Sequence, residues 1–270
     1  ESGTHPKKLY NTKTGVFVGV STTDYSEILS KNLNIEAHTS TGNAHSVVAN
    51  RISYLLNLKG PSVPIDTACS SSLVAINQAL LSLQKGECTQ AIVGGVNAIL
   101  TPNLHISFSK AGMLSPDGRC KTFSNKANGY VRGEGVGALY LKPLKDALQD
   151  GNQIHAVIKG SAVNHGGHVS GLTVPNPNAQ ADLIESALSD SGIEPSTISY
   201  IEAHGTGTSL GDPIEINGLK KVFEKVTEKN SIAVGTVKSN IGHLESAAGI
   251  AGVIKTILML KHKKITKTLH

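Results

Sequence analysis

Tryptophan is absent from the chain, and aromatic residues make up only 4% of its 270 positions. Proteins that bind nucleic acids commonly stack bases on aromatic side chains and carry dense Arg or Lys stripes. The net charge of +5, from 25 Lys and Arg against 20 Asp and Glu, is a modest surplus. The composition therefore predicts no nucleic-acid partner. A mild basic surplus fits an acidic protein partner, with ordinary surface solvation as an equally good explanation.

Long apolar runs are also missing. No segment approaches the roughly 20 consecutive apolar residues that a membrane-spanning helix needs. The N-terminal sequence Glu-Ser-Gly-Thr-His-Pro-Lys-Lys lacks the apolar core of a signal peptide. We therefore expect no membrane span and a cytoplasmic location.

Cysteine is scarce, with three widely spaced residues and no Cys-x-x-Cys pair. This pattern argues against a disulfide framework and against a zinc site. We interpret Cys88 and Cys120 as structural, whereas Cys69 has special surroundings. His165 and His168 have no third ligand in view, so we interpret them as loop-lining residues and predict no metal site.

Glycine is plentiful, with 28 residues, and short apolar runs alternate with amphipathic segments. The runs predict strands at residues 14–21, 62–66, 91–99, 138–141, 154–163, 198–203 and 232–236. Helical spacing predicts helices at residues 43–56, 69–83, 179–191, 213–223 and 247–261. Gly192 is expected to end the helix at 179–191. Residues 112–137 are polar and Gly-rich, and a loop of this length is usually functional or disordered.

The order of these segments predicts an α/β fold. Strands that alternate with helices favour parallel sheets covered on both faces. Residues 62–83 and 232–261 both contain a strand, then a reactive motif, then an apolar helix. This repetition indicates two related halves.

The first reactive motif is Asp-Thr-Ala-Cys-Ser-Ser-Ser at residues 66–72. It lies between a predicted strand and a predicted helix, so Cys69 comes near a helix N-terminus. Unpaired backbone N–H groups and the positive end of the helix dipole favour a thiolate there. A buried, inert cysteine is the alternative for this position alone.

Two further motifs place histidines at strand ends. Residues 202–208 read Glu-Ala-His-Gly-Thr-Gly-Thr, and a neutral His204 on that turn can hydrogen-bond a carbonyl oxygen or exchange a proton. Residues 238–245 read Lys-Ser-Asn-Ile-Gly-His-Leu-Glu, which brings Lys238, His243 and Glu245 to another strand-to-helix turn. Glu245 suits the start of the last helix and could pair with Lys238. A structural His204 and a capped helix with a surface lysine are the alternatives when each motif stands alone.

The three motifs together favour a site. Carboxyl ends of strands in α/β sheets are where ligands gather. One Cys and two His without an evident Asp or Asn partner differ from a thiol protease. In this order, the three motifs resemble the active-site motifs of β-ketoacyl synthases of the modular type I polyketide synthases. The segments at 111–123, 129–135 and 211–216 (AGMLSPDGRCKTF, GYVRGEG and GDPIEI) resemble the same family.

The resemblance implies a thiolase-like fold with two related α/β halves stacked in five layers, usually as a homodimer. The chain would be an internal fragment, incomplete at both ends, with its N-terminal half at about 1–150 and the start of its C-terminal half at about 151–270. It also implies an acyltransferase activity. An acyl group passes to Cys69, and a malonyl-type extender on an acyl carrier protein loses CO2 and condenses with it.

The residue roles follow from the same resemblance. Cys69 would be the nucleophile, and its backbone amide would be one oxyanion donor. His204 and His243 would stabilise the enolate, with Lys238 and Glu245 in support. No cofactor is bound directly, because substrates arrive on the phosphopantetheine of the carrier protein. Neighbouring synthase modules are the other expected partners.

Two alternatives to this function stay open. A fatty-acid or polyunsaturated-lipid condensing enzyme has the same fold and the same Cys-His-His set. A docking or gating domain that binds acyl carriers without condensing them is the non-enzymatic alternative. The intact set of Cys69, His204 and His243 favours the condensing enzyme.

Overall fold

The computed structural model describes residues 2–32, 35–224 and 231–270. The chain divides into two compact units. Unit 1 is Glu1–Ile106, Gly133–Val157 and Leu244–Ile257; unit 2 is Ser107–Arg132, Ile158–His243 and Leu258–His270. Among the described residues, no helix combines the length and apolar character that a membrane crossing requires.

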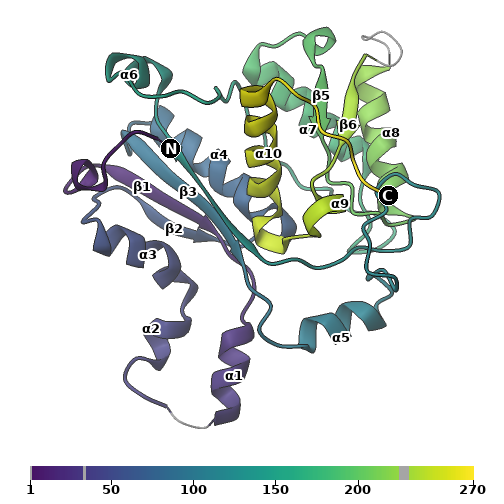
Figure 1. Ribbon diagram of the computed structural model, residues 1–270, viewed down its shortest axis with the longest axis horizontal. Helices are drawn as coiled ribbons and strands as arrows, with labels where there is room; N and C mark the ends of the chain where they lie inside the picture. The colour runs from purple at the N-terminus through teal and green to yellow at the C-terminus, as the bar shows by residue number, and fades with distance from the viewer. Residues whose placement is uncertain (1, 33–34, 225–230) are drawn as a thin grey trace. The chain divides into compact units, whose positions relative to one another are not determined.

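Unit 1 is built on a four-stranded sheet in the order β2-β1-β3-β4 (Figure 1). Its strands are β1 Thr14–Gly19, β2 Ser62–Ile65, β3 Gln90–Asn97 and β4 Gly135–Leu141. β1 is parallel to both neighbours, with Val16 opposite Ser62 on one side and Ile92 on the other. All 6 residues of β1 are buried, as expected for a central strand covered on both faces.

The fourth strand departs from the predicted parallel arrangement. β4 runs antiparallel to β3, with Ala91 opposite Leu141 and Asn97 opposite Gly135. A parallel return requires a crossover, usually a helix packed on the sheet. Residues 98–134 instead form a long excursion with one short helix, α5 Asn103–Lys110. The prediction of parallel pairing was therefore wrong at this edge.

Helices cover both faces of this sheet (Figure 1). Helix α4, Ser71–Gln84, packs on one face against Phe17. Helix α3, His45–Leu55, packs on the other face, where Val16 meets Ala49. Because successive side chains of a strand point to opposite faces, neighbouring residues of β1 supply two separate cores.

The helix predicted at 69–83 is present as a short 3-10 turn, η2 Ala68–Ser70, followed directly by α4. Ile76 and Ala79 of its apolar stripe are buried, whereas Leu73 is 47% exposed. The other elements that begin in unit 1 are η1 Pro6–Leu9, α1 Asp24–Asn32, α2 Thr39–Asn43, α6 Leu144–Gln149, η4 Glu245–Ala247 and α10 Ala248–His262.

Unit 2 holds a two-stranded parallel sheet of β5, Tyr200–Glu202, and β6, Ala233–Gly235. Helices α7, Pro177–Ser191, and α8, Gly211–Phe223, pack on each other and share an apolar core with side chains that flank the strands (Figure 1). The predicted helix stop at Gly192 is confirmed, because this residue has a left-handed φ of 63°. The remaining elements are η3 Pro195–Thr197 and α9 Lys238–Ile241.

The strand predicted at 154–163 is not formed, so this prediction was wrong. A strand needs a hydrogen-bonded neighbour, and no other described segment pairs with these residues. Val157 and Val163 are 46% and 54% exposed. The apolar pattern of a segment shows which side chains it can bury, but it does not show whether another strand is present to pair with it.

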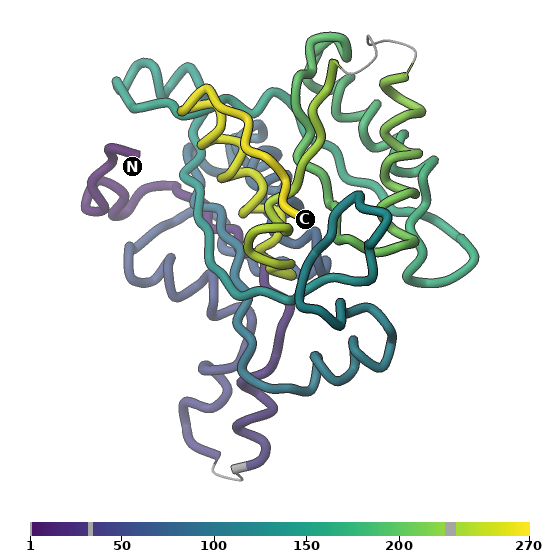
Figure 2. Tube along the Cα trace, turned by 45° about the vertical axis from the view of Figure 1, so that its right-hand side comes forward, coloured from purple at the N-terminus to yellow at the C-terminus, as the bar shows by residue number. Residues whose placement is uncertain are grey.

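The predicted long loop ends at residue 134, where β4 follows, and in Figure 2 it lies in the teal part of the chain. Leu114 and Tyr130 form a parallel bridge across its base. The N–H of Tyr130 donates to the carbonyl of Met113 at 3.1 Å, and the N–H of Ser115 donates to the carbonyl of Tyr130 at 2.9 Å. The loop is therefore closed by its own backbone.

Both segments that the sequence singled out have a 3-10 turn directly before their helix, although α9 lies between β6 and the second of these turns. β2 leads through η2 to α4, and β6 is followed by η4 and α10. Ala68 and Glu245, the first residues of the two 3-10 turns, have left-handed φ values of 54° and 47°. The same backbone device therefore precedes both helices.

Candidate active site

The turn that carries Cys69 is closed by its own polar side chains. Asp66 accepts the backbone N–H of Ala68 at 3.0 Å, and the Ser71 hydroxyl donates to the carbonyl of Ala68 at 2.6 Å. The left-handed φ of Ala68 costs roughly 1–2 kcal/mol in a residue with a Cβ, and such strain tends to collect at functional sites. Cys69 is half-buried in the first turn of the helical stretch 68–84. This is the presentation that the sequence predicts for it.

Glu245 belongs to the same unit as Cys69. The hydroxyl of Ser246 donates to a backbone carbonyl of β3 at 2.6 Å, and the hydroxyl of Ser72 accepts the N–H of Ile250 at 3.0 Å. These bonds tie η4 and α10 to the sheet and to the start of α4. A carboxylate oxygen of Glu245 thereby comes within 4.8 Å of the Cys69 Sγ.

His204 follows β5 on a turn that carboxylates of α8 hold in place. Glu215 Oε1 accepts the backbone N–H of His204 at 2.6 Å, and its Oε2 accepts that of Gly205 at 2.8 Å. Asp212 Oδ1 accepts the N–H of Gly207 at 3.0 Å. Hydrogen bonds to charged acceptors are the stronger kind. Helix α8 therefore fixes the backbone of the Gly-Thr-Gly-Thr run.

The turn that carries His243 is held in a similar way. Glu202 accepts the backbone N–H of Val237 at 2.6 Å, directly before α9. Gly242 has a φ of 76°, and a Cβ there would lie 3.0 Å from the carbonyl of Val131. The N–H of His243 donates to that same carbonyl at 2.7 Å. The turn therefore requires glycine at 242 to bring His243 against the neighbouring chain segment.

The imidazoles of His204 and His243 face each other within unit 2, with centroids 5.4 Å apart and planes at 84°. Burial lowers the pKa of His243 well below its ordinary value, and the charges of Lys238, His204 and Arg132 act in the same direction. His204 keeps a solvent-exposed edge, yet desolvation, followed by the charge of Lys238, lowers its pKa to about 3. Even a much smaller shift leaves both rings neutral at pH 7, where each ring donates one N–H.

The predicted site residues fall into two groups. Cys69 and Glu245 lie together in unit 1, and His204, His243 and Lys238 lie together in unit 2. The roles of all five, and the predicted pairing of Lys238 with Glu245, stay predictions. Cys88 and Cys120 are buried, and burial raises the pKa of both thiols, as suits structural cysteines.

Sequence reasoning missed the groups that hold these turns. Glu202, Asp212 and Glu215 each accept backbone N–H groups at strand-end turns. The first lies in the motif around His204, and the other two lie in the segment 211–216. The segment 129–135 was also singled out in the sequence. Its residues Tyr130, Val131 and Arg132 contact His243.

Comparison with known proteins supports a single family. The family model of the Beta-ketoacyl synthase, N-terminal domain matches residues 1–147 of the sequence. The family model of the Beta-ketoacyl synthase, C-terminal domain matches residues 155–270. The chain is 56% identical to the polyketide synthase PksN of Bacillus subtilis (strain 168), over 100% of this chain and 5% of that protein. It is 49% identical to the polyketide synthase ThaG of Burkholderia thailandensis, over 97% of this chain and 5% of that protein.

Solved structures agree with this assignment. The ketosynthase from module 6 of the bacillaene synthase of Bacillus subtilis 168 superposes with a TM-score of 0.93 at 47% identity, covering 99% of this chain and 46% of that one. The oxazolomycin ketosynthase domain OzmH KS7 of Streptomyces albus JA3453 superposes with a TM-score of 0.92 at 42% identity, covering 100% of this chain and 47% of that one. The chain thus spans about half of these ketosynthases and a small part of the synthases. It belongs to the β-ketoacyl synthase family, among the ketosynthase domains of modular polyketide synthases, and has their thiolase-like α/β fold.

Proposed function

We propose that this chain provides the condensing activity of a polyketide synthase, in which an acyl group on Cys69 is extended by decarboxylative Claisen condensation. The observation that supports this most strongly is the pair of neutral imidazoles, His204 and His243, 5.4 Å apart. Two N–H donors held on fixed turns suit an oxygen that gains negative charge during a reaction.

The first step is transfer of the acyl group. The Cys69 thiolate attacks the carbonyl carbon of a carrier-bound thioester, an S–C bond forms, and the carrier sulfur leaves and takes up the proton that Cys69 gave up. The position of Cys69 in the first turn of the stretch 68–84 favours the thiolate. The backbone amide of Cys69 serves as one donor to the oxyanion.

The second step is extension. A malonyl-type thioester loses CO2, and the electron pair of the broken C–C bond moves into an enolate whose oxygen accepts hydrogen bonds from His204 and His243. The enolate carbon attacks the Cys69 thioester, a C–C bond forms, and the Cys69 thiolate is released. Lys238 acts in support, because its charge adds to desolvation in lowering the pKa of both imidazoles. Glu245 acts in support of Lys238.

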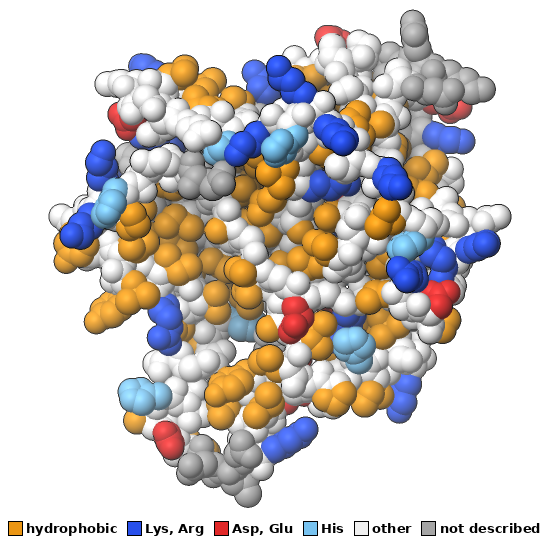
Figure 3. Space-filling model, viewed as in Figure 1, with side chains coloured by type: hydrophobic (Ala, Val, Ile, Leu, Met, Phe, Trp, Pro, Cys, Tyr) orange, Lys and Arg blue, Asp and Glu red, His pale blue; other side chains and the backbone are white. Residues whose placement is uncertain are grey.

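The substrates arrive on the phosphopantetheine of an acyl carrier protein, and no cofactor binds the chain directly. Neighbouring synthase modules are the other partners, and the location is cytoplasmic. On the face drawn in Figure 3, Lys and Arg side chains are spread over several places between hydrophobic ones. An acidic carrier protein is compatible with that distribution and with the net charge of +5.

A second copy of the chain is the partner that fits the free edge of the sheet in unit 1. β2 is an edge strand, hydrogen-bonded only to β1 among the described strands. Tyr54, Leu55 and Val63, on α3 and β2, are 84%, 69% and 38% exposed. Figure 3 shows hydrophobic side chains over this region. Unpaired edges with apolar neighbours favour strand pairing with another chain, so we propose a homodimer through β2.

Intact-mass measurement tests the nucleophile. The full-length protein and the 270-residue chain are each incubated with an acyl thioester, beside Cys69→Ala and the control Cys88→Ala. We expect the acyl mass on wild type and on Cys88→Ala and its absence from Cys69→Ala. An acyl mass on Cys69→Ala, or none on the full-length wild type, would contradict the proposal. The result for the 270-residue chain alone decides whether it acts by itself.

A second assay separates condensation from carrier docking. Acylated protein receives a malonyl thioester on a carrier protein, and release of CO2 and the β-ketoacyl product are measured. We expect both with wild type. Acylation or carrier binding without product would favour the non-condensing alternative. Comparison of acyl chains with and without β-oxygen substituents distinguishes a polyketide from a fatty-acid condensing enzyme.

A further inference from the structure

The segment 129–132 fixes the backbone of His243. Arg132 and His243 form a parallel β-bridge, and the N–H of His243 donates to the carbonyl of Val131 at 2.7 Å. The thiol sulfur of Cys120 accepts the N–H of Val131 at 3.2 Å, so Val131 is held both by Cys120 and by His243. This short piece of chain is therefore fixed by two contacts, and it fixes the backbone of the histidine in turn.

The side chains of the same segment continue the contact. The ring of Tyr130 lies 5.2 Å from the imidazole of His243, with 52° between the planes. The ring of Phe108 is 6.4 Å from that of Tyr130, and the guanidinium of Arg132 lies over the Phe108 ring at 5.4 Å. The ring contacts link these groups in the order guanidinium of Arg132, ring of Phe108, ring of Tyr130, imidazole of His243 and imidazole of His204. Each member limits the tilt of the next.

The buried guanidinium is the unusual member of this row. Arg132 is only 6% exposed, as is Tyr130. Taking a charged group out of water is costly, and an apolar side chain of similar volume fills such a position without that cost. Arginine stays charged in proteins, and its planar group stacks on an aromatic face in a way that lysine does not. The position therefore holds a fixed positive charge and a flat stacking surface beside His243.

We propose that Arg132 is a positioning residue for His243, acting through Phe108 and Tyr130 to hold the imidazole plane. The inference rests on the proposed function, in which His243 donates a hydrogen bond to the enolate oxygen. It assigns a role to the Gly-Tyr-Val-Arg-Gly-Glu-Gly segment that the condensation steps leave without one.

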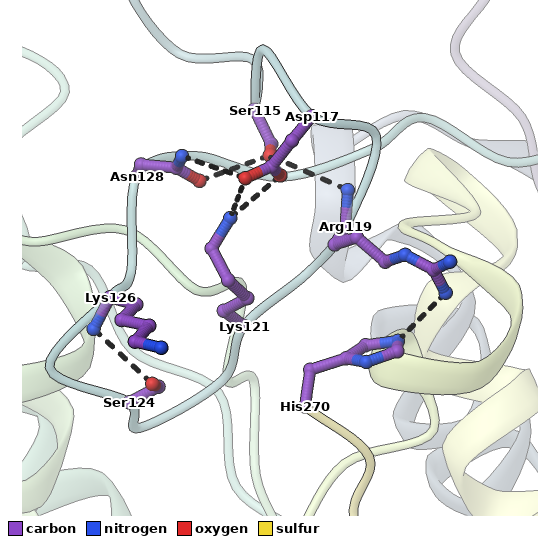
Figure 4. A network of polar contacts seen from close by, with 8 residues as sticks. All are labelled: Ser115, Asp117, Arg119, Lys121, Ser124, Lys126, Asn128 and His270. Atoms are coloured by element: carbon purple, nitrogen blue, oxygen red, sulfur yellow. Dashed lines mark hydrogen bonds and ion pairs between the residues drawn. The ribbon is translucent and has the colours of Figure 1, made fainter.

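The loop that carries this segment has its own polar brace (Figure 4). Lys121 Nζ contacts both carboxylate oxygens of Asp117 at 2.6 Å. The Ser115 hydroxyl donates to Asp117 at 2.7 Å, and the Asn128 amide donates to it at 3.4 Å. Arg119 points away from this brace, toward His270 (Figure 4). It is an exposed arginine of the same loop and supplies a matched control.

The test uses the full-length protein with Arg132→Met, Arg132→Lys and the control Arg119→Met. Two rates are measured for each: acylation of Cys69 by an acyl thioester, and CO2 release from a malonyl thioester by the acylated protein. For Arg132→Met we expect CO2 release to fall about 10–100-fold, because a small displacement of a reacting group is costly. Acylation should stay within about twofold of wild type, since Cys69 does not depend on His243. Arg119→Met should match wild type in both.

The pH profile of CO2 release distinguishes positioning from simple structural damage. Desolvation lowers the pKa of His243 most, followed by the charge of Lys238, that of His204 when it is protonated, and that of Arg132. Arg132→Met removes a positive charge, which raises the pKa of His243, so the acid limb of its pH profile for CO2 release should move to higher pH. Arg132→Lys keeps the charge, so it should keep the acid limb of wild type while CO2 release becomes slower.

The inference is overturned if Arg132→Met releases CO2 at the wild-type rate, or if it loses acylation and CO2 release equally. Should Arg132→Met not fold, an Arg132→Lys rate equal to wild type overturns the stacking role. A wild-type protein that forms no acyl-Cys69 would refute the proposed function instead.

Discussion

The carboxylate of Glu215 offers the sharpest test of how the His204 turn is built. Glu215→Ala removes both acceptors from the backbone N–H groups of His204 and Gly205. Hydrogen bonds to charged groups contribute about 1.5–3 kcal/mol each, so the gross loss is about 3–6 kcal/mol. Burial of the carboxylate offsets part of the stabilisation by these hydrogen bonds, because desolvation raises the pKa of Glu215 despite the two bonds. We therefore expect a net loss of about 1–3 kcal/mol in the free energy of unfolding.

The kinetic effect should be about as large in free energy as the effect on stability. Without Glu215 the turn is free to move, and a displacement of about 1 Å can cost about 100-fold in rate. Glu215→Gln keeps the shape but sets an amide N–H against a backbone N–H, so it should also lower CO2 release. Acylation of Cys69 should be unchanged in both variants. Glu224→Ala, at the exposed end of α8, is the matched control.

The assay combines denaturant unfolding with the two rate measurements on acylated protein. If Glu215→Ala unfolds as predicted but releases CO2 at the wild-type rate, His204 does not need this turn, and the account of the site is wrong. The pH dependence has a definite sign. Since the folded pKa of this carboxyl is raised, its contribution to stability is greatest below its unfolded value and declines as pH rises through the folded one. Glu215→Gln should remove that component.

Three other predictions follow from single contacts. Gly242→Ala should cost about 1–3 kcal/mol in unfolding experiments and slow CO2 release, because its left-handed φ and the carbonyl at 3.0 Å leave no room for a Cβ; a variant as stable and active as wild type would refute this. Asp117→Asn should speed amide hydrogen exchange in the loop 115–128. In wild type, hydrogen exchange of this loop should speed up only as pH falls from the ordinary carboxyl range toward 2, because contacts with Lys121 hold the pKa of Asp117 at about 2. Equal exchange rates in the two proteins would count against the brace. CO2 release should show no acid limb near the ordinary histidine pKa, since the pKa values of His204 and His243 are both lowered. For the same reason, the two histidines contribute stability above the ordinary histidine pKa that is lost as pH falls, and a limb at that pKa would contradict the lowered pKa values of the two rings.

Local patterns predicted most elements because their causes are local. Short apolar runs marked β1 and β3, helical spacing marked α7 and α8, and Gly192 ended α7 as expected. Pairing is not local. The apolar run at 154–163 has the pattern of a strand but no neighbour among the described residues, and the direction of β4 depends on how residues 98–134 return to the sheet.

The site followed the same division. Small residues around Cys69, His204 and His243 predicted turns near strand ends, and the structure has non-strand segments there. The left-handed φ of Ala68 could not be predicted, because that conformation ordinarily calls for glycine. Glu215 lies 11 residues from His204, and a glutamate on an amphipathic helix gives no sign that it turns inward. Such contacts depend on packing between elements, which periodicity does not describe.

The central claim is that acyl transfer depends on Cys69, whereas decarboxylation depends on the two imidazoles. The most direct test measures both steps in His204→Ala. We predict that this variant forms acyl-Cys69 at nearly the wild-type rate and releases CO2 from a malonyl thioester about 100- to 1,000-fold more slowly, the usual cost of removing one preorganised donor. Loss of acylation with CO2 release from pre-acylated protein preserved would contradict the account.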